Sequence, residues 1–161
     1  MLASAVLVGV LAGLMTGGRL ARLADLHIAW VPLLVLALAA RVFAPTFGES
    51  LPAWLLGFSA IVAVAVANRR IPGMWAIAAG AGLNLLVVVV NGAMPVDPAA
   101  AAAAGSSIPA DGLHRELRAG DLLTFLADRI PVPPIGGVYS LGDVVLAAGA
   151  FWVPFAWMRR R

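Results

Sequence analysis

Five long apolar runs constrain the fold of this chain more than any other feature of its sequence. They cover residues 1–16, 28–44, 51–67, 71–90 and 141–158, and the charged residues within them are Arg41 and Asp143, each near one end of its run. A membrane-spanning helix needs about 17 to 25 mostly apolar residues. The runs are too long for strands and do not alternate as the strands of a membrane barrel do. The sequence therefore predicts an all-α fold, a transmembrane bundle of five helices.

The composition agrees with this prediction. The chain is 62% hydrophobic and 12% charged, with a mean hydropathy of +0.97, whereas a typical soluble domain has about 25% charged residues. The absence of cysteine excludes disulfides and thiolate metal sites, and two histidines are too few for a protein-only zinc site of the usual kind. We expect no metal and no cofactor.

The arginines predict the orientation of the bundle. All eleven basic residues are arginine, and seven of them lie beside apolar runs, at positions 19, 22, 69, 70 and 159–161. Short cytoplasmic loops are enriched in such residues, and five spans put all these clusters on one side. We therefore expect an outer N-terminus, an inner C-terminus and no nucleic-acid partner. The first run follows no basic residue, so we expect an uncleaved anchor rather than a signal peptide.

The predicted domain organisation has three parts. Residues 1–91 form four spans, 92–140 an outer segment, and 141–161 the fifth span with a basic cytoplasmic tail. Six of the eight acids lie between Asp97 and Asp143. Within the outer segment we predict a flexible linker or short alanine helix near 98–105, a polar helix over 111–118, an amphipathic interfacial helix over 121–129, and then a Pro/Gly loop.

Asp143 is the main candidate for chemistry, because a carboxylate near the end of a span is costly unless it is paired or hydrated. A structural interpretation competes with this one. Ser140 precedes Asp143 by three residues, the spacing of a capping box at a helix start. The acid would also be stabilised by the positive end of the helix dipole.

Three other polar side chains complete a predicted cluster with Ser140 and Asp143. Arg41 either extends its guanidinium to the membrane interface or pairs with Asp143 or Glu49. Asn84 and Asn91 share one helical face, seven residues apart. They form either ordinary interhelical hydrogen bonds or the polar face of a cleft that opens outward.

The remaining candidates have plainer interpretations. Asp121 is predicted to cap its helix and Asp128 to pair with its neighbour Arg129. His27 and His114 are expected to be surface histidines. A GxxxG motif formed by Gly9 and Gly13 indicates close helix packing.

Four motifs occur in order along most of the chain: GGRL at 17–20, NGAMPV at 91–96, DRIPVPP at 128–134 and VYSLGD at 138–143. With these motifs the chain resembles a family of small bacterial polytopic membrane proteins of unknown function. The resemblance implies a helical membrane fold and no particular activity.

A local stretch is also similar to lipoprotein signal peptidase, a four-span membrane aspartyl protease with one Asp in an NxxDR block and another in an FNxAD block. Asp128 with Arg129 resembles the first block, and Ser140 to Asp143 resembles the second. The asparagine before the first Asp is missing here. The resemblance implies two carboxylates that share a proton and activate water.

Three functions follow from the sequence. The first is a non-enzymatic binding or accessory subunit of a larger membrane assembly or homo-oligomer, because reactive groups are sparse. The second is an aspartyl peptidase-like enzyme that uses Asp128 and Asp143, which requires these carboxylates to converge. The third is an oligomeric transporter of small solutes. In each case we expect a multi-pass protein of the bacterial inner (cytoplasmic) membrane, with the lipid bilayer as its main partner.

Overall fold

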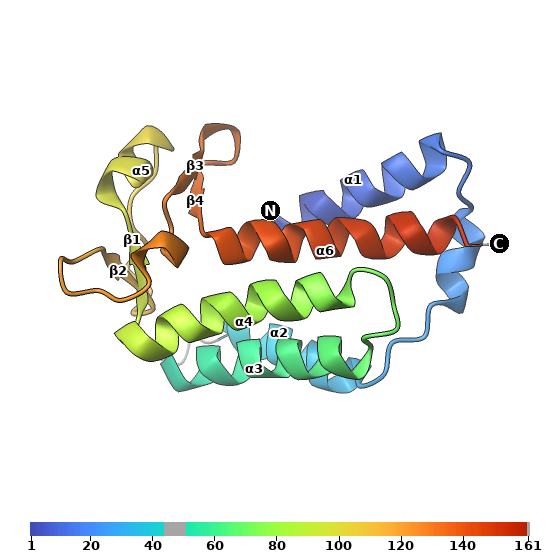
Figure 1. The fold of residues 1–161 in the computed structure, drawn as a ribbon, viewed down its shortest axis with the longest axis horizontal. Coiled ribbons are helices and arrows are strands. Elements are labelled where there is room, and N and C mark those ends of the chain that lie inside the picture. The colour runs from blue at the N-terminus through green and yellow to red at the C-terminus, as the bar shows by residue number, and fades with distance from the viewer. Residues whose placement is uncertain (44–50, 161) are drawn as a thin grey trace.

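The computed structural model describes residues 1–43 and 51–160, without the side chains at 38 and 40–43. The chain is mostly helical, with a few short strands (Figure 1). Among the described residues, each apolar run contains one long helix: α1 (Leu2–Met15), α2 (Val31–Phe43), α3 (Leu51–Ala67), α4 (Met74–Asn91) and α6 (Leu141–Met158). A 3₁₀ helix, η1 (Leu20–Asp25), connects α1 to α2. By length and composition, α4 and α6 are each able to cross a membrane, while α1 and α3 are shorter apolar helices.

Helix α6 lies at the centre of the bundle. It packs against α1 on one side and α4 on the other, while α3 packs against α4 and α2 packs against α3 (Figure 1). Glycines allow the backbones to approach closely, since a Cβ at Gly80 would collide with the Gly142 carbonyl of α6 and a Cβ at Gly9 with the Phe151 carbonyl. Gly13 likewise faces Met158. The predicted packing role of the GxxxG motif is therefore confirmed.

Residues 92–140, here called the cap region, fold over one end of the bundle (Figure 1). Gly92 ends α4 with a φ of 70°, a conformation that glycine adopts without strain, and its N–H donates to the Val88 carbonyl. The elements that follow are β1 (Met94–Val96), α5 (Pro98–Ala103), β2 (His114–Glu116), η3 (Thr124–Leu126), β3 (Ile130–Val132), η4 (Pro133–Ile135) and β4 (Gly137–Tyr139). Strand β1 pairs with β2 in parallel, and β3 pairs with β4 antiparallel. A single bridge between Val96 and Asp128 joins the two pairs.

A continuous apolar core fixes the cap region to the bundle. From the cap region, Met94, Leu113 and Leu126 are buried in the same cluster as residues of three long helices, namely Trp54, Phe58, Ala81, Val87, Val88 and Leu146. Burial of a side chain of this size contributes about 1.5 to 3 kcal/mol. The cap region is therefore part of the folded core.

Two helices predicted in the cap region are wrong. Residues 111–118 form a turn and strand β2, because the Asp111 side chain accepts hydrogen bonds from the backbone of Leu113 and His114 and the chain then pairs with β1. Residues 121–129 contain only the short helix η3. Leu123 has a φ of 54° and Ala127 is extended, so no continuous helix forms there.

The alanine-rich segment does form the short helix that was one of its two predicted conformations. Asp97 caps α5 by accepting from the Ala99 N–H at 2.9 Å, and Pro98 occupies the first turn. The predicted all-α class is correct for the bundle. It is incomplete for the cap region, where short strands pair with one another.

Candidate acid–base site

Asp128 occupies a buried position between β1 and the start of α6. Its backbone N–H donates to the Pro95 carbonyl at 2.9 Å, and its carbonyl accepts from the Asp97 N–H at 2.9 Å, so β1 and the residue after it fix its backbone. The residue is 5% exposed, and its Oδ1 atom is buried without a hydrogen-bond partner among the described residues. Burial, reinforced by the negative charge of Asp143, raises the pKa of Asp128 to about 8. The carboxyl is therefore protonated at neutral pH.

Asp143 lies in the first turn of α6, where it forms the predicted capping box with Ser140. The Ser140 Oγ accepts from the Asp143 N–H at 3.0 Å, and the Asp143 Oδ2 accepts from the Ser140 N–H at 3.1 Å. The Asp143 Oδ1 accepts from the Asn84 side chain of α4 at 2.8 Å. Both oxygens of Asp143 therefore act as hydrogen-bond acceptors.

Asn84 connects the cap of α6 to α4. The Ser140 hydroxyl lies 2.8 Å from the Asn84 Oδ1 and 3.0 Å from the Asp143 Oδ2, and its single hydrogen is donated to one of them at a time. Gly142 leaves the necessary space, because a Cβ there would collide with the Asn84 amide. The predicted interhelical hydrogen bonding by Asn84 is confirmed.

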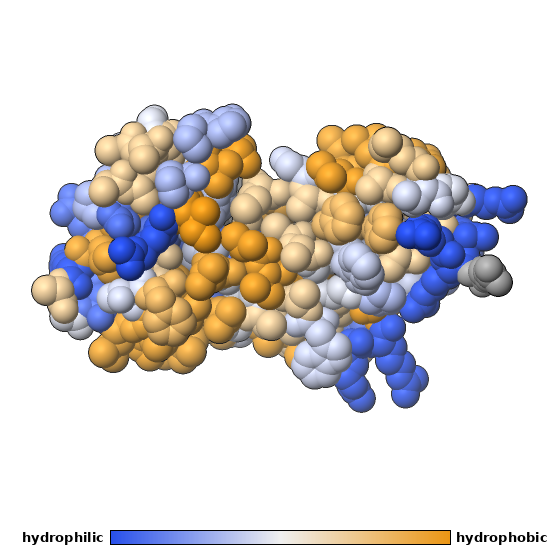
Figure 2. Space-filling view, turned by 45° about the horizontal axis from the view of Figure 1, so that its top comes forward, coloured by the Kyte–Doolittle hydropathy of each residue, from blue (hydrophilic) through white to orange (hydrophobic). Residues whose placement is uncertain are grey.

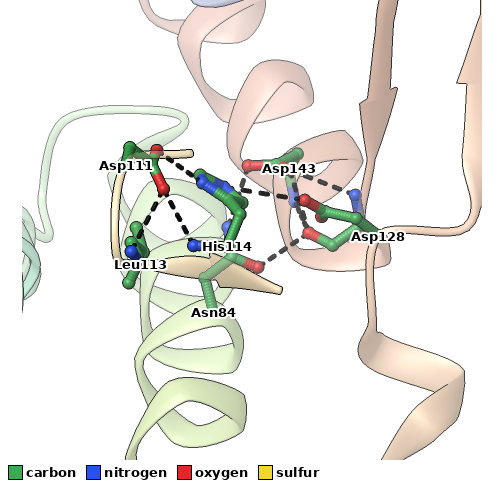
Figure 3. Close-up of polar contacts among 7 residues, drawn as sticks. Asn84, Asp111, Leu113, His114, Asp128 and Asp143 are labelled. Carbon is green, nitrogen blue, oxygen red and sulfur yellow. Dashed lines mark hydrogen bonds and ion pairs between the residues drawn. The ribbon is translucent and has the colours of Figure 1, made fainter. Parts of the chain in front are cut away.

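The fold brings Asp128 within range of the negative charge of Asp143. The enzyme hypothesis, which requires the two carboxyl groups to converge, stays a prediction. Figure 3 shows both residues in the same group of side chains, and the negative charge of Asp143 contributes to the raised pKa of Asp128. One carboxyl is buried and neutral, while the other accepts hydrogen bonds on both oxygens. A protonated carboxyl near a second carboxyl that accepts hydrogen bonds is an arrangement that can provide a general acid and a general base.

His114 faces Asp128 from strand β2, and Asp111 fixes its ring (Figure 3). The His114 Nδ1 lies 2.7 Å from the Asp111 Oδ2. Partial burial favours a higher pKa for Asp111, but hydrogen bonds from the backbone and ring of His114 outweigh it and the pKa is lowered. Because Asp111 is an ionised acceptor, Nδ1 carries a proton, and Nε2 is left facing the Asp128 Oδ2 at 3.9 Å.

The distance between His114 and Asp128 is too long for a direct hydrogen bond, and a neutral Asp128 forms no ion pair. A water or a small movement would connect the two groups. The prediction of His114 as a surface histidine is wrong, because its side chain is 20% exposed and lies between two carboxyl groups. In the sequence, the three-residue spacing of Asp111 and His114 is a signal that these two side chains meet.

A pocket of about 140 Å³, here called the polar pocket after its polar residues, opens beside this group, and apolar residues such as Val96 and Val138 also line it. His114 and Asp128 line it together with Ser106, Ser107, Gly136 and Gly137. The glycines leave the pocket wall without side chains at the β3–β4 turn. The protonated carboxyl therefore has access to a space that water or a small polar group can enter.

Two predicted residues lie outside this group. The Asn91 amide donates to the Val87 and Leu122 carbonyls and accepts from the Leu122 N–H, so it anchors the loop after β2. Asp121 caps no helix. It pairs with Arg115 at 2.8 and 2.5 Å, and this interaction lowers the pKa of Asp121 to about 2.

The predicted pairing of Asp128 with Arg129 is also wrong. The Arg129 Nε lies 3.4 Å from the Asp97 Oδ2, because adjacent residues of an extended chain point in opposite directions. His27 is exposed, and its Nδ1 lies 2.9 Å from the Asp25 carbonyl.

The predicted ion pairs of Arg41 involve parts of the chain that are not described. Arg41 belongs to α2, but its side chain lies outside the described residues, and so does Glu49. Within residues 1–43 and 51–160, no group of three or more His, Asp or Glu residues is arranged to hold a metal ion.

Comparison with curated proteins and with solved structures gave no match. A family model, described as a family of unknown function, matches residues 25–155. The matched residues include Asp111, His114, Asp128 and Asp143, and the match confirms the predicted resemblance to an uncharacterised family. The chain therefore belongs to DUF5317, a family of unknown function.

Proposed function

We propose that this chain is a multi-pass protein of the bacterial cytoplasmic membrane that uses Asp128 and Asp143 to hydrolyse peptide bonds at the outer face. The proposed topology has five spans, with the N-terminus outside and the C-terminus inside. It is supported by the hydrophobic middle of the molecule, which separates two hydrophilic ends (Figure 2). The arginine clusters gather at the end opposite the cap region, where the Arg22 Nη1 donates to the Met158 carbonyl at 2.9 Å.

The observation that carries the proposed activity is the buried carboxyl of Asp128, without a hydrogen-bond partner on Oδ1 among the described residues and next to Asp143. A buried polar atom without a partner costs about 1 to 3 kcal/mol, and a chain retains such an atom most readily where it has a use. The local similarity to lipoprotein signal peptidase is centred on these same two aspartates.

The proposed reaction uses one water molecule and returns both carboxyl groups to their starting states. Water bonds to the peptide carbonyl carbon and gives a proton to Asp143, while Asp128 gives its proton to the carbonyl oxygen. The resulting diol then gives a proton back to Asp128, and Asp143 protonates the nitrogen as the C–N bond breaks. The products are a carboxylic acid and an amine.

His114 has a supporting role in this proposal. Its Nε2 faces Asp128 from the polar pocket, and Asp111 holds the ring in one orientation. A proton can therefore pass between Asp128 and the pocket through His114 or a water beside it.

The test is cleavage of a mixture of quenched fluorogenic peptides by the full chain purified in mild detergent. We expect cleavage by the wild type, and a loss of at least about 100-fold in both Asp128→Asn and Asp143→Asn, the usual contribution of an acid or base. The matched control is Asp25→Asn, which removes an exposed aspartate that is far in sequence from Asp128 and Asp143. Wild-type rates in Asp128→Asn, or no cleavage of any peptide, would refute the proposal.

The accessory-subunit and transporter hypotheses remain predictions. A transport path needs polar groups that reach the middle of the bundle. Asn84, a strongly polar residue well inside a predicted span, is 2% exposed and bonded to Ser140 and Asp143. Its contacts favour a site at the end of the bundle over a path through it.

A further inference from the structure

A second cavity, of about 320 Å³, lies inside the helical bundle. Apolar side chains from α1, α2, α3, α4 and α6 line it, among them Val6, Leu34, Ile61, Ile77 and Leu146. Asp143 is the one charged residue among the described residues of the lining. The cavity extends along α6 from Asp143 to Ala150, which is about 10 Å at the helical rise.

The part of the cavity lining that α1 contributes is also exposed at the surface. Leu2 and Val6 line the cavity and are 44% and 43% exposed. Helix α1 packs along α6, and α2 packs along α3, so the opening lies between these two pairs. In the proposed membrane topology this surface faces the hydrocarbon of the bilayer.

The lining determines what can occupy the cavity. Apolar cavities of this kind exclude water and accept apolar molecules. A cavity that is apolar along its length and opens to the bilayer fits a single hydrocarbon chain, which enters without desolvation of a polar group. A peptide side chain or a soluble metabolite would leave most of this wall unfilled.

Asp143 connects the two cavities of the molecule. It lines the apolar cavity, and it lies beside Asp128, which lines the polar pocket of the cap region. We infer that the substrate carries one hydrocarbon chain, which lies in the apolar cavity and brings the attached polar group to Asp128 and Asp143. This inference rests on the proposed hydrolytic function and adds the class of substrate, a peptide with a single acyl chain.

Chain binding can be measured without any activity. The probe is palmitate with a photoactivatable diazirine, added to the purified full chain in phosphatidylcholine nanodiscs and located by peptide mass spectrometry. We expect labelling of cavity residues that excess unlabelled palmitate suppresses. Ala150→Leu and Ala65→Leu, which narrow the cavity from two helices, should lose most of this competed labelling. Ala148→Leu, on the exposed face of α6, should retain it.

Catalysis provides the second measurement. A fluorogenic peptide with an N-terminal palmitoyl chain should be cleaved with a kcat/KM about tenfold or more above that of the same peptide without the chain, because binding of a remote group lowers the barrier. The preference should fall in Ala150→Leu and remain in Ala148→Leu.

The outcomes separate the two claims. Competed labelling without cleavage of either peptide would overturn the proposed hydrolysis and leave the chain-binding cavity intact. Cleavage of both peptides at equal rates, without competed labelling, would overturn the chain-binding inference alone. Competed labelling that is unchanged in both Ala150→Leu and Ala65→Leu would also overturn the chain-binding inference.

Discussion

The protonated state of Asp128 depends on contacts that its neighbours in sequence do not provide. Its backbone is held by Pro95 and Asp97 of the cap region, and its carboxyl is buried beside Asp143 of α6. Arg129, the adjacent cation, pairs with Asp97 instead. A buried carboxyl with a raised pKa in a pocket is a common property of catalytic acids, which is why this residue is central to the account.

The raised pKa predicts a pH-dependent stability. The pKa of Asp128 is about 8 in the folded chain, against an ordinary value of 3.8. Between these values the folded chain retains a proton that the unfolded chain releases. Stability should therefore fall as pH rises from about 4 to about 8, by up to about 1.4 kcal/mol per pH unit, and level off above that. Thermal unfolding of the purified protein in detergent, followed from about pH 5 to about pH 9, measures this effect.

Two variants check the assignment of this slope to Asp128. Asp128→Asn carries no titrating group at this position, so its unfolding temperature should vary less with pH than that of the wild type. Asp25→Asn, at an exposed position, should retain the wild-type slope. An equal slope in Asp128→Asn and the wild type would show that other groups cause it.

Single residues could be predicted from sequence where the signal is local. The spacing of Ser140 and Asp143 predicted the capping box, and both of its hydrogen bonds are present. The relation of His114 to Asp128 was missed, because it depends on a turn at Asp111 and on strand pairing between β1 and β2. The spacing of Asp111 and His114 indicates the turn, but the strand pairing cannot be read from the residue types alone.

At the scale of elements, α4 and α6 are held together by glycines at their contact. A Cβ at Gly80 would collide with backbone atoms of Gly142 and Leu146. Gly80→Ala should therefore push the helices apart and weaken the contact of Asn84 with Asp143. We expect a loss of stability of about 1 to 3 kcal/mol, typical of overpacking, in thermal unfolding.

Gly82 offers a matched control on the same helix. A Cβ there meets nothing within 4 Å. Gly82→Ala should be neutral or stabilising by up to about 1 kcal/mol, because alanine favours the helix. If Gly80→Ala is as stable as Gly82→Ala, the close contact between α4 and α6 is wrong.

The long elements could be predicted from the sequence, whereas the short strands could not. The apolar runs predicted the five long helices, and for α3 and α6 even the bounds agree. Each strand of the cap region has three residues, and β1 pairs with β2 across 20 residues of sequence. Strands so short are stabilised by their partners rather than by their own pattern, and the sequence alone predicted a helix in place of β2 and a Pro/Gly loop in place of β3 and β4.

At the scale of the whole molecule, the cap region and the arginine clusters lie at opposite ends of a hydrophobic bundle (Figures 1 and 2). The proposed orientation puts the cap region outside the cell. The chain has no cysteine, so single cysteines can report on it directly. A membrane-impermeant maleimide should label Ser107→Cys of the cap region in intact cells.

The opposite end supplies the control for this topology. Ala24→Cys lies in η1, just after Arg19 and Arg22, and should react only after the cells are opened. Labelling of Ala24→Cys but not Ser107→Cys in intact cells would show that the orientation is the opposite of the proposed one. Labelling of both positions in intact cells would contradict the proposed membrane topology.

The protonation of Asp128 beside Asp143 is the central claim, and infrared titration of the purified full chain tests it most directly. The account predicts a carboxylic-acid band at pH 7 that disappears with a midpoint near the Asp128 pKa of about 8 and that is missing in Asp128→Asn. Asp25→Asn should retain the band. A wild-type spectrum without a protonated carboxyl at pH 7, or an unchanged band in Asp128→Asn, would contradict the account.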